Sequence, residues 1–312
     1  MEFIPENHIL EFRPDTLQTI RKQYNFEKPG EMDRAIDIIE LWIKKQAHFT
    51  KKDFPREYLE KMIIANKGSI ERAKVKLDKI CTFRTIMPDF FGDNLTTHDF
   101  SDLDDFYNIL LPKQTDNNVR VYFLKNVGQK FTVQQFMNYY RLLVLICEYI
   151  IRHDYCNGMM VLIDYTETNL IELMKCLTVT DLRQITAIVT EGFGMRLKGI
   201  HIITTSKTVD ALVTIMKQLL SAKVGNRICV HKDISTVYQY VPQEILPSEY
   251  GGKEKSITKL RNEVLNALTS KDFKSYIQEM NKAKTDEAYR QTDKFNEQYM
   301  GMPGSFRTLS VD

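Results

Sequence analysis

The stretch Arg196-Leu-Lys-Gly-Ile-His-Ile-Ile203 decides the fold of this chain, together with the residues from there to the segment Ile245-Leu-Pro-Ser-Glu-Tyr-Gly-Gly252. Residues 199–205 are rich in β-branched side chains, a pattern that predicts a strand covered on both faces. A helix is expected at 206–220 and a second short strand at 227–232. Because a helix would connect the two strands, we expect them to be parallel and joined by a right-handed crossover.

The helix expected at 206–220 has one apolar face along its whole length. Ser206 is placed to cap it, and Asp210 lies in its first turn, near the positive end of the helix dipole. Apolar residues recur at spacings of three and four: Val209, Leu212, Val213, Met216, Leu219 and Leu220. Cations surround this helix: Arg196, Lys198, Lys217, Lys223 and Arg227. An apolar helix edged by cations can close over an apolar cavity, and it can also lie on an anionic membrane surface. The periodicity does not exclude an ordinary helix that faces the core.

Composition excludes several classes of protein. The chain has 312 residues, with 43 Lys and Arg against 41 Asp and Glu, so no overall field would hold it on nucleic acid. The first residues lack the features of a signal peptide, and no apolar run approaches the ~20 residues of a membrane-spanning helix. The five cysteines include no Cys-x-x-Cys pair, which favours buried free thiols. We therefore expect a cytoplasmic protein.

The first 90 residues carry only helical patterns. Helices are expected at 15–24 and 31–46, from Phe54-Pro55 onward, and from Ser69 to a point before Met87-Pro88. Residues 91–118, rich in Asp, Asn and Thr, are predicted to be a linker.

The periodicity changes after this segment. Residues 119–126 alternate as a strand, and Thr132-Val-Gln-Gln135 forms a capping box that opens a long apolar helix to about Arg152. Residues 158–165 are the next strand. Strands that alternate with helices predict an α/β fold with a mostly parallel sheet.

We therefore divide the chain into three parts: an N-terminal all-helical bundle at 1–94, an α/β domain at 95–255, and C-terminal helices with a docked tail at 256–312. The last part contains two amphipathic patterns. Their apolar residues are Ile257, Leu260, Val264 and Leu268, then Phe273, Tyr276, Ile277 and Met280.

No motif for catalysis is complete. The turns after the strands contain no phosphate-binding glycine loop, and Gly-x-Ser-x-Gly is absent. Cys229, His231 and His201 could form a nucleophile and base pair or part of a metal site; a buried thiol beside a hydrogen-bonded histidine is the favoured interpretation, because no further cluster completes either site. Asp164 could act as a base or metal ligand, but such a residue more often binds amides of the following turn. We expect no catalytic residue, metal or cofactor.

Four segments together resemble the CRAL-TRIO lipid-binding family: Gly158-Met-Met-Val-Leu-Ile-Asp164, Arg196-Leu-Lys-Gly-Ile-His-Ile-Ile203, Arg227-Ile-Cys-Val-His231 and Ile245-Leu-Pro-Ser-Glu-Tyr-Gly-Gly252. The Leu-Pro-x-Glu-Tyr-Gly-Gly pattern is the most specific of them. The likeness points to the α-tocopherol transfer protein-like and retinaldehyde-binding-like members. The final Gly304-Ser-Phe-Arg-Thr-Leu309 is similar to the ending of insect-type members.

The resemblance implies a non-enzymatic carrier, in which an N-terminal helical bundle precedes a sheet flanked by helices that enclose a hydrophobic pocket. By the same resemblance, the ligand would contact Leu143, Cys147, Met159, Ile163, Ile188, Val189 and Ile200, with Val209, Val213 and Met216 beneath a gate helix at 206–220. A basic cleft for phosphoinositide head groups would use Arg196, Lys198, Lys223 and Arg227, with Lys217 nearby. Hydrophobic lipid and an anionic membrane surface are the implied partners, and nucleic acid is not.

The chain departs from the family pattern at several places. The family's Leu-Arg-Ala-Arg segment is Ile64-Ala-Asn66-Lys67 here, which removes cations from the basic cleft. Asn-x-Pro is replaced by Thr204-Thr-Ser206, and Lys-Pro-Phe in the gate by Lys217-Gln-Leu219. Leu143 and Cys147 replace serines of the tocopherol branch, so the resemblance alone does not assign tocopherol as the ligand of this chain.

The sequence thus predicts transfer of a retinoid, tocopherol, carotenoid or similar lipid between membranes by a cytoplasmic, transiently membrane-associated protein. Two alternatives stay open: a transfer protein for phosphatidylinositol or phosphatidylcholine, and a non-transporting adaptor whose pocket is occluded.

Overall fold

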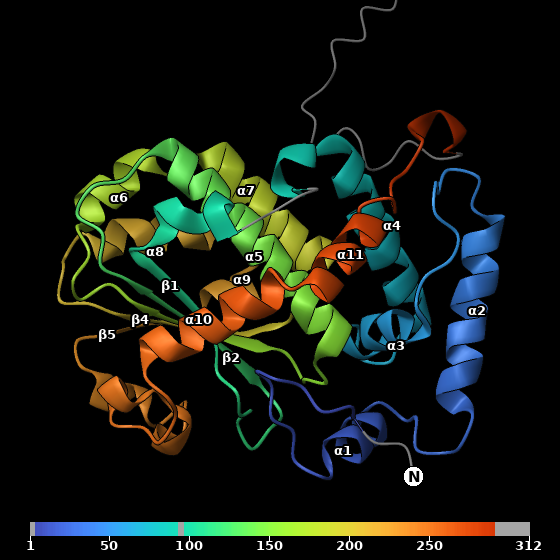
Figure 1. Ribbon diagram of the computed structural model, residues 1–312, viewed down its shortest axis with the longest axis horizontal. Helices are drawn as coiled ribbons and strands as arrows, with labels where there is room; N and C mark the ends of the chain where they lie inside the picture. The colour runs from blue at the N-terminus through green and yellow to red at the C-terminus, as the bar shows by residue number, and fades with distance from the viewer. Residues whose placement is uncertain (1–3, 93–96, 291–312) are drawn as a thin grey trace, which may run out of the picture.

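A five-stranded sheet with strand order β1-β2-β3-β4-β5 lies at the centre of the computed structural model, which describes residues 4–92 and 97–290 (Figure 1). The strands are β1 (Phe106–Leu110), β2 (Arg120–Asn126), β3 (Met159–Asp164), β4 (Leu197–Ile203) and β5 (Ile228–His231). β1 is antiparallel to β2, and the other pairs are parallel. The mostly parallel α/β architecture predicted from the alternating patterns is confirmed.

Helices surround the sheet and form the N-terminal part of the chain. The α-helices are α1 (Thr16–Gln23), α2 (Glu31–Lys45), α3 (Arg56–Ala65), α4 (Ile70–Ile86), α5 (Val133–His153), α6 (Leu170–Cys176), α7 (Val179–Ala187), α8 (Val209–Leu219), α9 (Ala222–Gly225), α10 (Ile257–Leu268) and α11 (Lys271–Met280). Shorter turns are η1 (Pro88–Phe90), η2 (Thr97–Leu103), η3 (Ile188–Gly192), η4 (Ile234–Val237), η5 (Gln243–Ile245), η6 (Ser248–Tyr250) and η7 (Glu287–Tyr289). Of these, η3 is a π-helical turn that continues α7.

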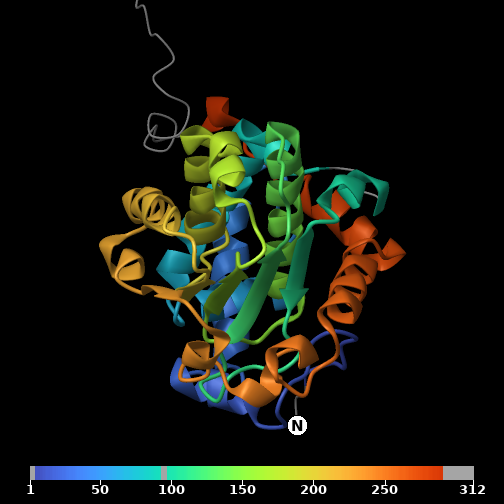
Figure 2. The same ribbon diagram turned by 90° about the vertical axis from the view of Figure 1, so that its left-hand side faces the viewer.

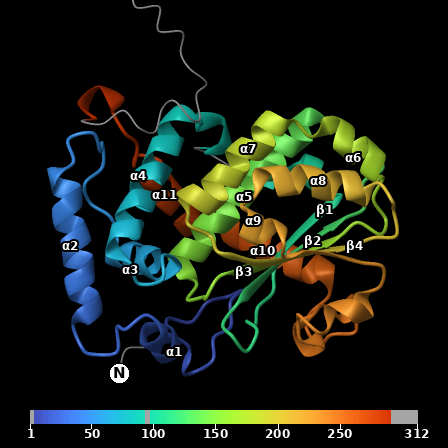
Figure 3. The same ribbon diagram turned by 180° about the vertical axis from the view of Figure 1, so that it is seen from behind.

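The two faces of the sheet carry different covers. Helices α5, α7 and α8 lie over one face, and the segment from η4 to η6 lies below the other (Figures 1 and 2). Alternation along β3 sends Val161 and Ile163 to the helix side and Leu162 to the opposite side. Seen from behind, α8 lies between α7 and the strands (Figure 3), and α7 and α8 are in contact.

The N-terminal helices pack against the α/β part through a shared core. One cluster of buried apolar side chains includes Ile36 of α2, Leu59 of α3, Leu77 of α4, Ile146 of α5 and Phe273 of α11. The division at residues 94 and 255 therefore stays a prediction, because this core runs across it. Residues 291–312, including the tail predicted to dock, lie outside the described residues.

Several local predictions are confirmed. Thr132 and Gln135 form the expected reciprocal capping box at the start of α5. Ser69 caps α4, which ends at Ile86 before Pro88. The two C-terminal amphipathic patterns are α10 and α11, and their apolar positions are buried except Tyr276, which is half-buried.

Two local predictions are wrong, and the prediction of buried free thiols holds in part. Residues 91–118 are not simply a linker, because the short strand β1 stands among the polar residues there. Ser206 does not cap α8: its Oγ accepts from the backbone N–H of Thr208, two residues on, and the helix begins only at Val209. Of the five free cysteines, Cys81 and Cys147 are buried, and the other three are half-buried.

Candidate functional site

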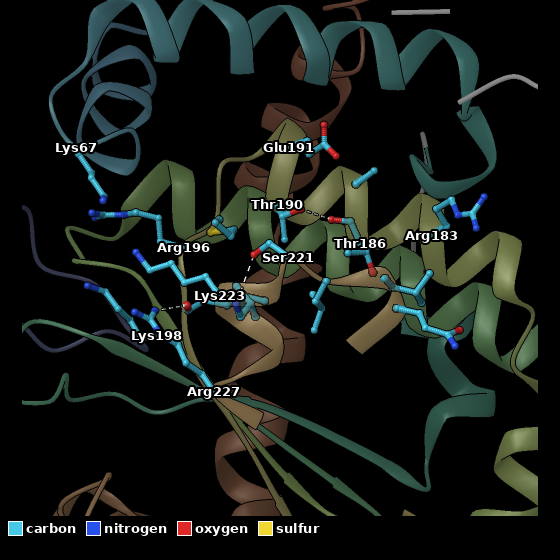
Figure 4. Close-up of a pocket in the computed structure, with 17 residues that line it drawn as sticks. Lys67, Arg183, Thr186, Thr190, Glu191, Arg196, Lys198, Ser221, Lys223 and Arg227 are labelled. Carbon is cyan, nitrogen blue, oxygen red and sulfur yellow. Dashed lines mark hydrogen bonds between the residues drawn. The ribbon is translucent and has the colours of Figure 1, made fainter. Parts of the chain in front are cut away.

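A cleft of about 680 Å³ opens where the C-terminal end of α8 meets α9, α7, η3 and the start of β4 (Figure 4). Its polar lining is mostly cationic, and its apolar residues come from the ends of α7 and α8, from α9 and from the start of β4 with the residues before it. The lining residues are Lys67, Arg183, Thr186, Ala187, Thr190, Glu191, Met195, Arg196, Leu197, Lys198, Gln218, Leu219, Leu220, Ser221, Lys223, Val224 and Arg227. We call this site the cationic cleft.

Arg196 has hydrogen-bonding capacity to spare. Its Nη1 donates to the hydroxyl of Tyr24 at 2.6 Å, and its guanidinium lies 5.2 Å from the centre of the Tyr24 ring. Its Nε and Nη2 are buried, with no hydrogen-bond partner among the described residues. Since an unpaired buried donor is costly, these two N–H groups favour an anion or water at this position.

Lys198 shows that the cleft carries uncompensated positive charge. Its Nζ donates to Asn157 Oδ1 at 3.4 Å. Burial lowers the pKa of Lys198, and Arg196, Arg227 and Lys67 lower it further by repulsion. The only carboxylate among the lining residues is Glu191, which forms an ion pair with Lys79 of α4. A bound anion would relieve this repulsion.

The structure brings together four of the five cations predicted from the sequence: Arg196, Lys198, Lys223 and Arg227. The fifth, Lys217, is exposed on α8 and is not among the lining residues. The functional role of all five stays a prediction.

Two lining cations, Lys67 and Arg183, were not singled out from the sequence. Lys67 follows the end of α3 in a left-handed conformation, with φ of 59°, and Gly68 follows with φ of 76°. The amide of Gly68 returns to the carbonyl of Ile63 at 2.9 Å, which fixes this turn. The Asn-Lys-Gly sequence signals a helix end, and the signal that links this segment to the 196–227 region is the family resemblance, which sets it against a segment of the basic cleft.

The predicted ligand contacts all belong to one hydrophobic cluster or pack directly against it. Seven are buried: Cys147, Met159, Ile163, Ile188, Val189, Ile200 and Val209. Leu143, Val213 and Met216 are half-buried. None of the ten lines the cationic cleft. Their assignment as ligand contacts therefore stays a prediction.

The segment Leu246-Pro-Ser-Glu-Tyr-Gly-Gly252 is held against the end of β3. The Tyr250 hydroxyl donates to Asp164 Oδ2, and the Tyr250 ring lies 4.8 Å from that of Phe123. A Cβ on Gly252 would lie 1.8 Å from the carbonyl oxygen of Leu246, so no larger residue fits without moving the backbone. The motif is thus a structural clamp on the sheet.

Comparison with known proteins accounts for this motif. The CRAL/TRIO domain model matches residues 105–252, which include all five strands and end at the second glycine of the motif. Residues 105–252 are a CRAL/TRIO domain. The resemblance seen in the sequence is therefore confirmed for the family, and lipid binding is supported as its coarse function.

Relatives extend the similarity beyond the CRAL/TRIO domain. A mouse protein named "Alpha-tocopherol transfer protein-like" is 23% identical over 284 residues, covering 88% of this chain and 81% of the relative. Clavesin-2 of Rattus norvegicus is 32% identical over 97 residues, which are 31% of this chain and 29% of clavesin-2. Among solved structures, a crystal structure of Sfh5 matches with a TM-score of 0.47 and 14% identity, covering 87% of this chain and 98% of Sfh5.

The candidate catalytic groups of the CRAL/TRIO domain have structural partners. His201 Nδ1 lies 3.0 Å from His231 Nε2, and His231 Nδ1 lies 2.7 Å from Thr236 Oγ1. Burial lowers the pKa of His201 to about 4. Asp164 accepts from the N–H and hydroxyl of Thr166, as expected for a residue that binds the following turn. Within residues 4–92 and 97–290, no three His, Cys, Asp or Glu side chains gather as metal ligands.

Packing between the sheet of the CRAL/TRIO domain and its helices is incomplete. Val161 occupies the central strand, paired with Tyr122 and Ile200, on the face covered by helices, yet it is only half-buried. Tyr139 of α5 also keeps some accessible surface. Its phenol lies deep enough for burial to raise its pKa. Among the described helices, none is both long enough and apolar enough to span a bilayer.

Proposed function

We propose that this chain encloses a hydrophobic lipid between its sheet and α8 and transfers it between membranes, while the cationic cleft holds the phosphate-bearing head group of an anionic membrane lipid. One observation carries the proposal: the C-terminal end of α8 lines the cationic cleft, through Gln218, Leu219 and Leu220. A head group in the cleft would therefore touch the helix that covers the lipid.

The half-buried apolar positions support an enclosed ligand. Val161 on the sheet, Leu143 on α5, and Val213 and Met216 on α8 all pack on the same hydrophobic cluster and all keep accessible surface. Removing about 400 Å² of apolar ligand from water stabilises a complex by roughly 10 kcal/mol before the costs of association. Those costs are estimated at ~4–15 kcal/mol, so tight binding needs a preformed site.

The charges of the cleft support a phosphate-bearing head group. Arg196 offers two unpaired N–H donors, and Lys198 is destabilised by its cationic neighbours. Hydrogen bonds from cations to phosphate oxygens are about twice as strong as neutral ones. Against the family's Leu-Arg-Ala-Arg pattern, Lys67 keeps a positive charge at one arginine position, and Ala65 stands at the other.

A membrane would favour opening of α8. The helix has buried apolar residues Val209 and Leu212 facing the core, and displacing it would expose them at roughly 1.5–3 kcal/mol each in water. Contact with a bilayer removes most of that cost, while a head group in the cleft binds the moved helix end. Both effects shift the equilibrium toward the open state.

The names of the relatives indicate a general class of ligand and no particular molecule. The mouse relative's name refers to α-tocopherol. Leu143 and Cys147 make the proposed site of this chain apolar at the two positions where the tocopherol branch has serines. A retinoid, tocopherol, carotenoid or similar lipid fits such a site.

Native mass spectrometry of the purified protein tests the hydrophobic site, because it identifies any lipid carried through purification. A retinoid, sterol-like or isoprenoid mass supports the proposal. Phosphatidylinositol or phosphatidylcholine would establish the phospholipid-transfer alternative. Neither bound lipid nor uptake of a fluorescent hydrophobic ligand would favour the adaptor alternative and end the transfer proposal.

Vesicle binding tests the cleft separately. We expect Arg196→Met combined with Arg227→Met to weaken binding to vesicles containing phosphatidylinositol bisphosphate by at least about tenfold, since each lost charge-assisted bond contributes about 1.5–3 kcal/mol. Lys217→Met is the matched control, because Lys217 is exposed near the cleft but does not line it. Equal losses in the control and the double variant would refute a specific role for the cleft.

A further inference from the structure

A second cavity, of about 960 Å³, is lined by the N-terminal segment 5–9, α3, the end of α5, and helices α10 and α11. It shares no lining residue with the cationic cleft. Its volume falls in the ~300–1,000 Å³ range of small-molecule sites. Nothing in the proposed transfer function uses it. We call it the aromatic cavity, because Tyr58, Tyr149, Tyr155, Phe273 and Tyr276 form much of its wall.

Lys61 places a nearly buried cation in the wall of this cavity. The residue is 6% exposed, and burial lowers its pKa. Within the described residues its Nζ makes two contacts: it lies 3.5 Å from the carbonyl oxygen of Glu57, at the limit of a hydrogen bond, and 4.6 Å from the centre of the Tyr155 ring. An ammonium group has three donors, so most of the capacity of Lys61 is unused.

The buried carboxylates near Lys61 are already engaged. Glu60 accepts from Arg21 at 2.9 Å and from the Tyr155 hydroxyl at 2.9 Å. Asp154 accepts from Arg120 at 2.7 Å and from Gln114 at 2.9 Å. Lys61 therefore stands beside carboxylates whose charge is compensated by other groups. An incoming anion would supply the direct partner that Lys61 lacks.

Arg152 adds a second cation on the same wall. Its guanidinium lies 4.5 Å from the centre of the Tyr276 ring, and its Nη1 is 2.9 Å from Asp272 Oδ2, without the geometry of a hydrogen bond. The Asp272 side chain is 79% exposed, so this ion pair is weak and can be exchanged for another anion.

Aromatic rings line the same cavity as the two cations. The rings of Tyr149 and Phe273 are 5.4 Å apart, and those of Phe273 and Tyr276 are 5.7 Å apart. His153 adds a ring 4.5 Å from Tyr149. Burial lowers the pKa of His153 to about 4, so its imidazole is neutral at physiological pH. These surfaces suit the hydrocarbon part of an amphipathic molecule.

The lining carboxylates restrict the charge of the occupant. Four carboxylates line the cavity: Glu6, Glu57 and Asp272 are exposed, and Glu263 is half-buried and paired with Lys255, whereas Lys61 is buried. A polyanion would meet repulsion from these carboxylates, whereas a single acid group on Lys61 and Arg152 would only take the place of Asp272 at Arg152. The cavity thus discriminates against polyphosphorylated head groups.

We propose that the aromatic cavity binds an amphipathic monoanion, a single carboxylate or sulfonate on an apolar body, with the acid group on Lys61 and Arg152. The body of the ligand lies on Tyr149, Phe273 and Tyr276. This is a second ligand site, separate from the sheet and from α8.

Photolabelling of the full chain with a diazirine-bearing dodecanoate tests this site, because peptide mapping separates it from the hydrophobic cluster under α8. We expect labelled peptides from α11 and the segment 5–9. Lys61→Met should reduce this labelling about tenfold, because it removes a hydrogen bond to a charged group. Lys61→Arg should retain the labelling, and the corresponding diazirine alcohol should label these peptides weakly.

Arg152→Gln supplies an independent test should Lys61→Met fail to fold, since Arg152 is half-buried at the cavity wall. Lys223→Met, in the cationic cleft, is the matched control and should leave α11 labelling unchanged. Equal labelling by the acid and the alcohol, or labelling of α11 that survives both Lys61→Met and Arg152→Gln, would overturn the proposal. The labelling of α8 peptides reports on the transfer proposal separately.

Discussion

The two faces of the sheet are built differently, although the same strands form both. On the side of η4 to η6, Leu162, Val121 and Phe123 are each 0% exposed, and they pack on Val237 and Leu246, also 0% exposed. On the helix side, Val161 is half-buried although it is adjacent to Leu162 in the central strand. The face towards η4 to η6, which we call the filled face, is thus close-packed at these positions, and the lipid proposed to lie under α8 would account for the accessible surface that Val161 keeps on the helix side.

The largest effect is expected from truncating the filled face. Leu162→Ala would leave a cavity in a close-packed core and should lower the free energy of unfolding by about 2–5 kcal/mol. Val161→Ala is the matched control on the other face and should cost less than about 1 kcal/mol, because its surroundings are already incomplete. Urea unfolding of lipid-free protein measures both. Similar losses for the two variants would contradict the contrast between the faces.

Enlarging the same two residues sharpens the comparison. Leu162→Phe adds volume to a full core and should cost about 1–3 kcal/mol. Val161→Phe should leave the free energy of unfolding nearly unchanged, but it should weaken uptake of a fluorescent hydrophobic ligand by at least about tenfold, since it occupies the space proposed for the lipid. Fluorescence titration measures the uptake. Normal uptake by a folded Val161→Phe protein would place the ligand elsewhere.

The contrast between the faces could not be predicted from the sequence, although much of the fold could. The capping box at Thr132 and the strand and helix order from residue 119 onward rest on local patterns, and those patterns were sufficient. β1 was missed because its five residues stand in a polar stretch. Val161 and Leu162 are similar apolar residues in one run, and only the packing of α5 and α8 makes their exposure differ.

Part of the cationic cleft could also be predicted, because four of its cations belong to elements that local sequence patterns predict. Arg196, Lys198, Lys223 and Arg227 come from a single strand–helix–strand unit, whose parallel strands place the start of β4 and the start of β5 at the same edge of the sheet. Lys67 comes from the N-terminal part of the chain. Its position depends on the left-handed turn after α3, which the local sequence signals, and on packing across the shared core, which no local pattern predicts.

The smallest expected effect is a dependence of stability on pH at the edge of the filled face. His201 and His231 are 2% and 6% exposed, and they share a hydrogen bond beside Tyr240 and Cys229. Burial first, and then the neighbouring His231, lowers the pKa of His201 from 6.5 to about 4, and burial also lowers the pKa of His231. The unfolded chain therefore takes up protons at a higher pH than the folded protein does.

Since the unfolded state binds more protons between pH 6.5 and about 4, stability falls as the pH falls through this window. For His201 the loss between neutral pH and mildly acidic pH is about 1 kcal/mol. Urea unfolding at several pH values measures it, with His201→Asn as the variant and His153→Asn as a comparison, because the pKa of His153 is also lowered to about 4 by burial. If His201→Asn loses as much free energy of unfolding on acidification as the unaltered chain does, the prediction is wrong. Other groups would then cause the loss of stability at acidic pH.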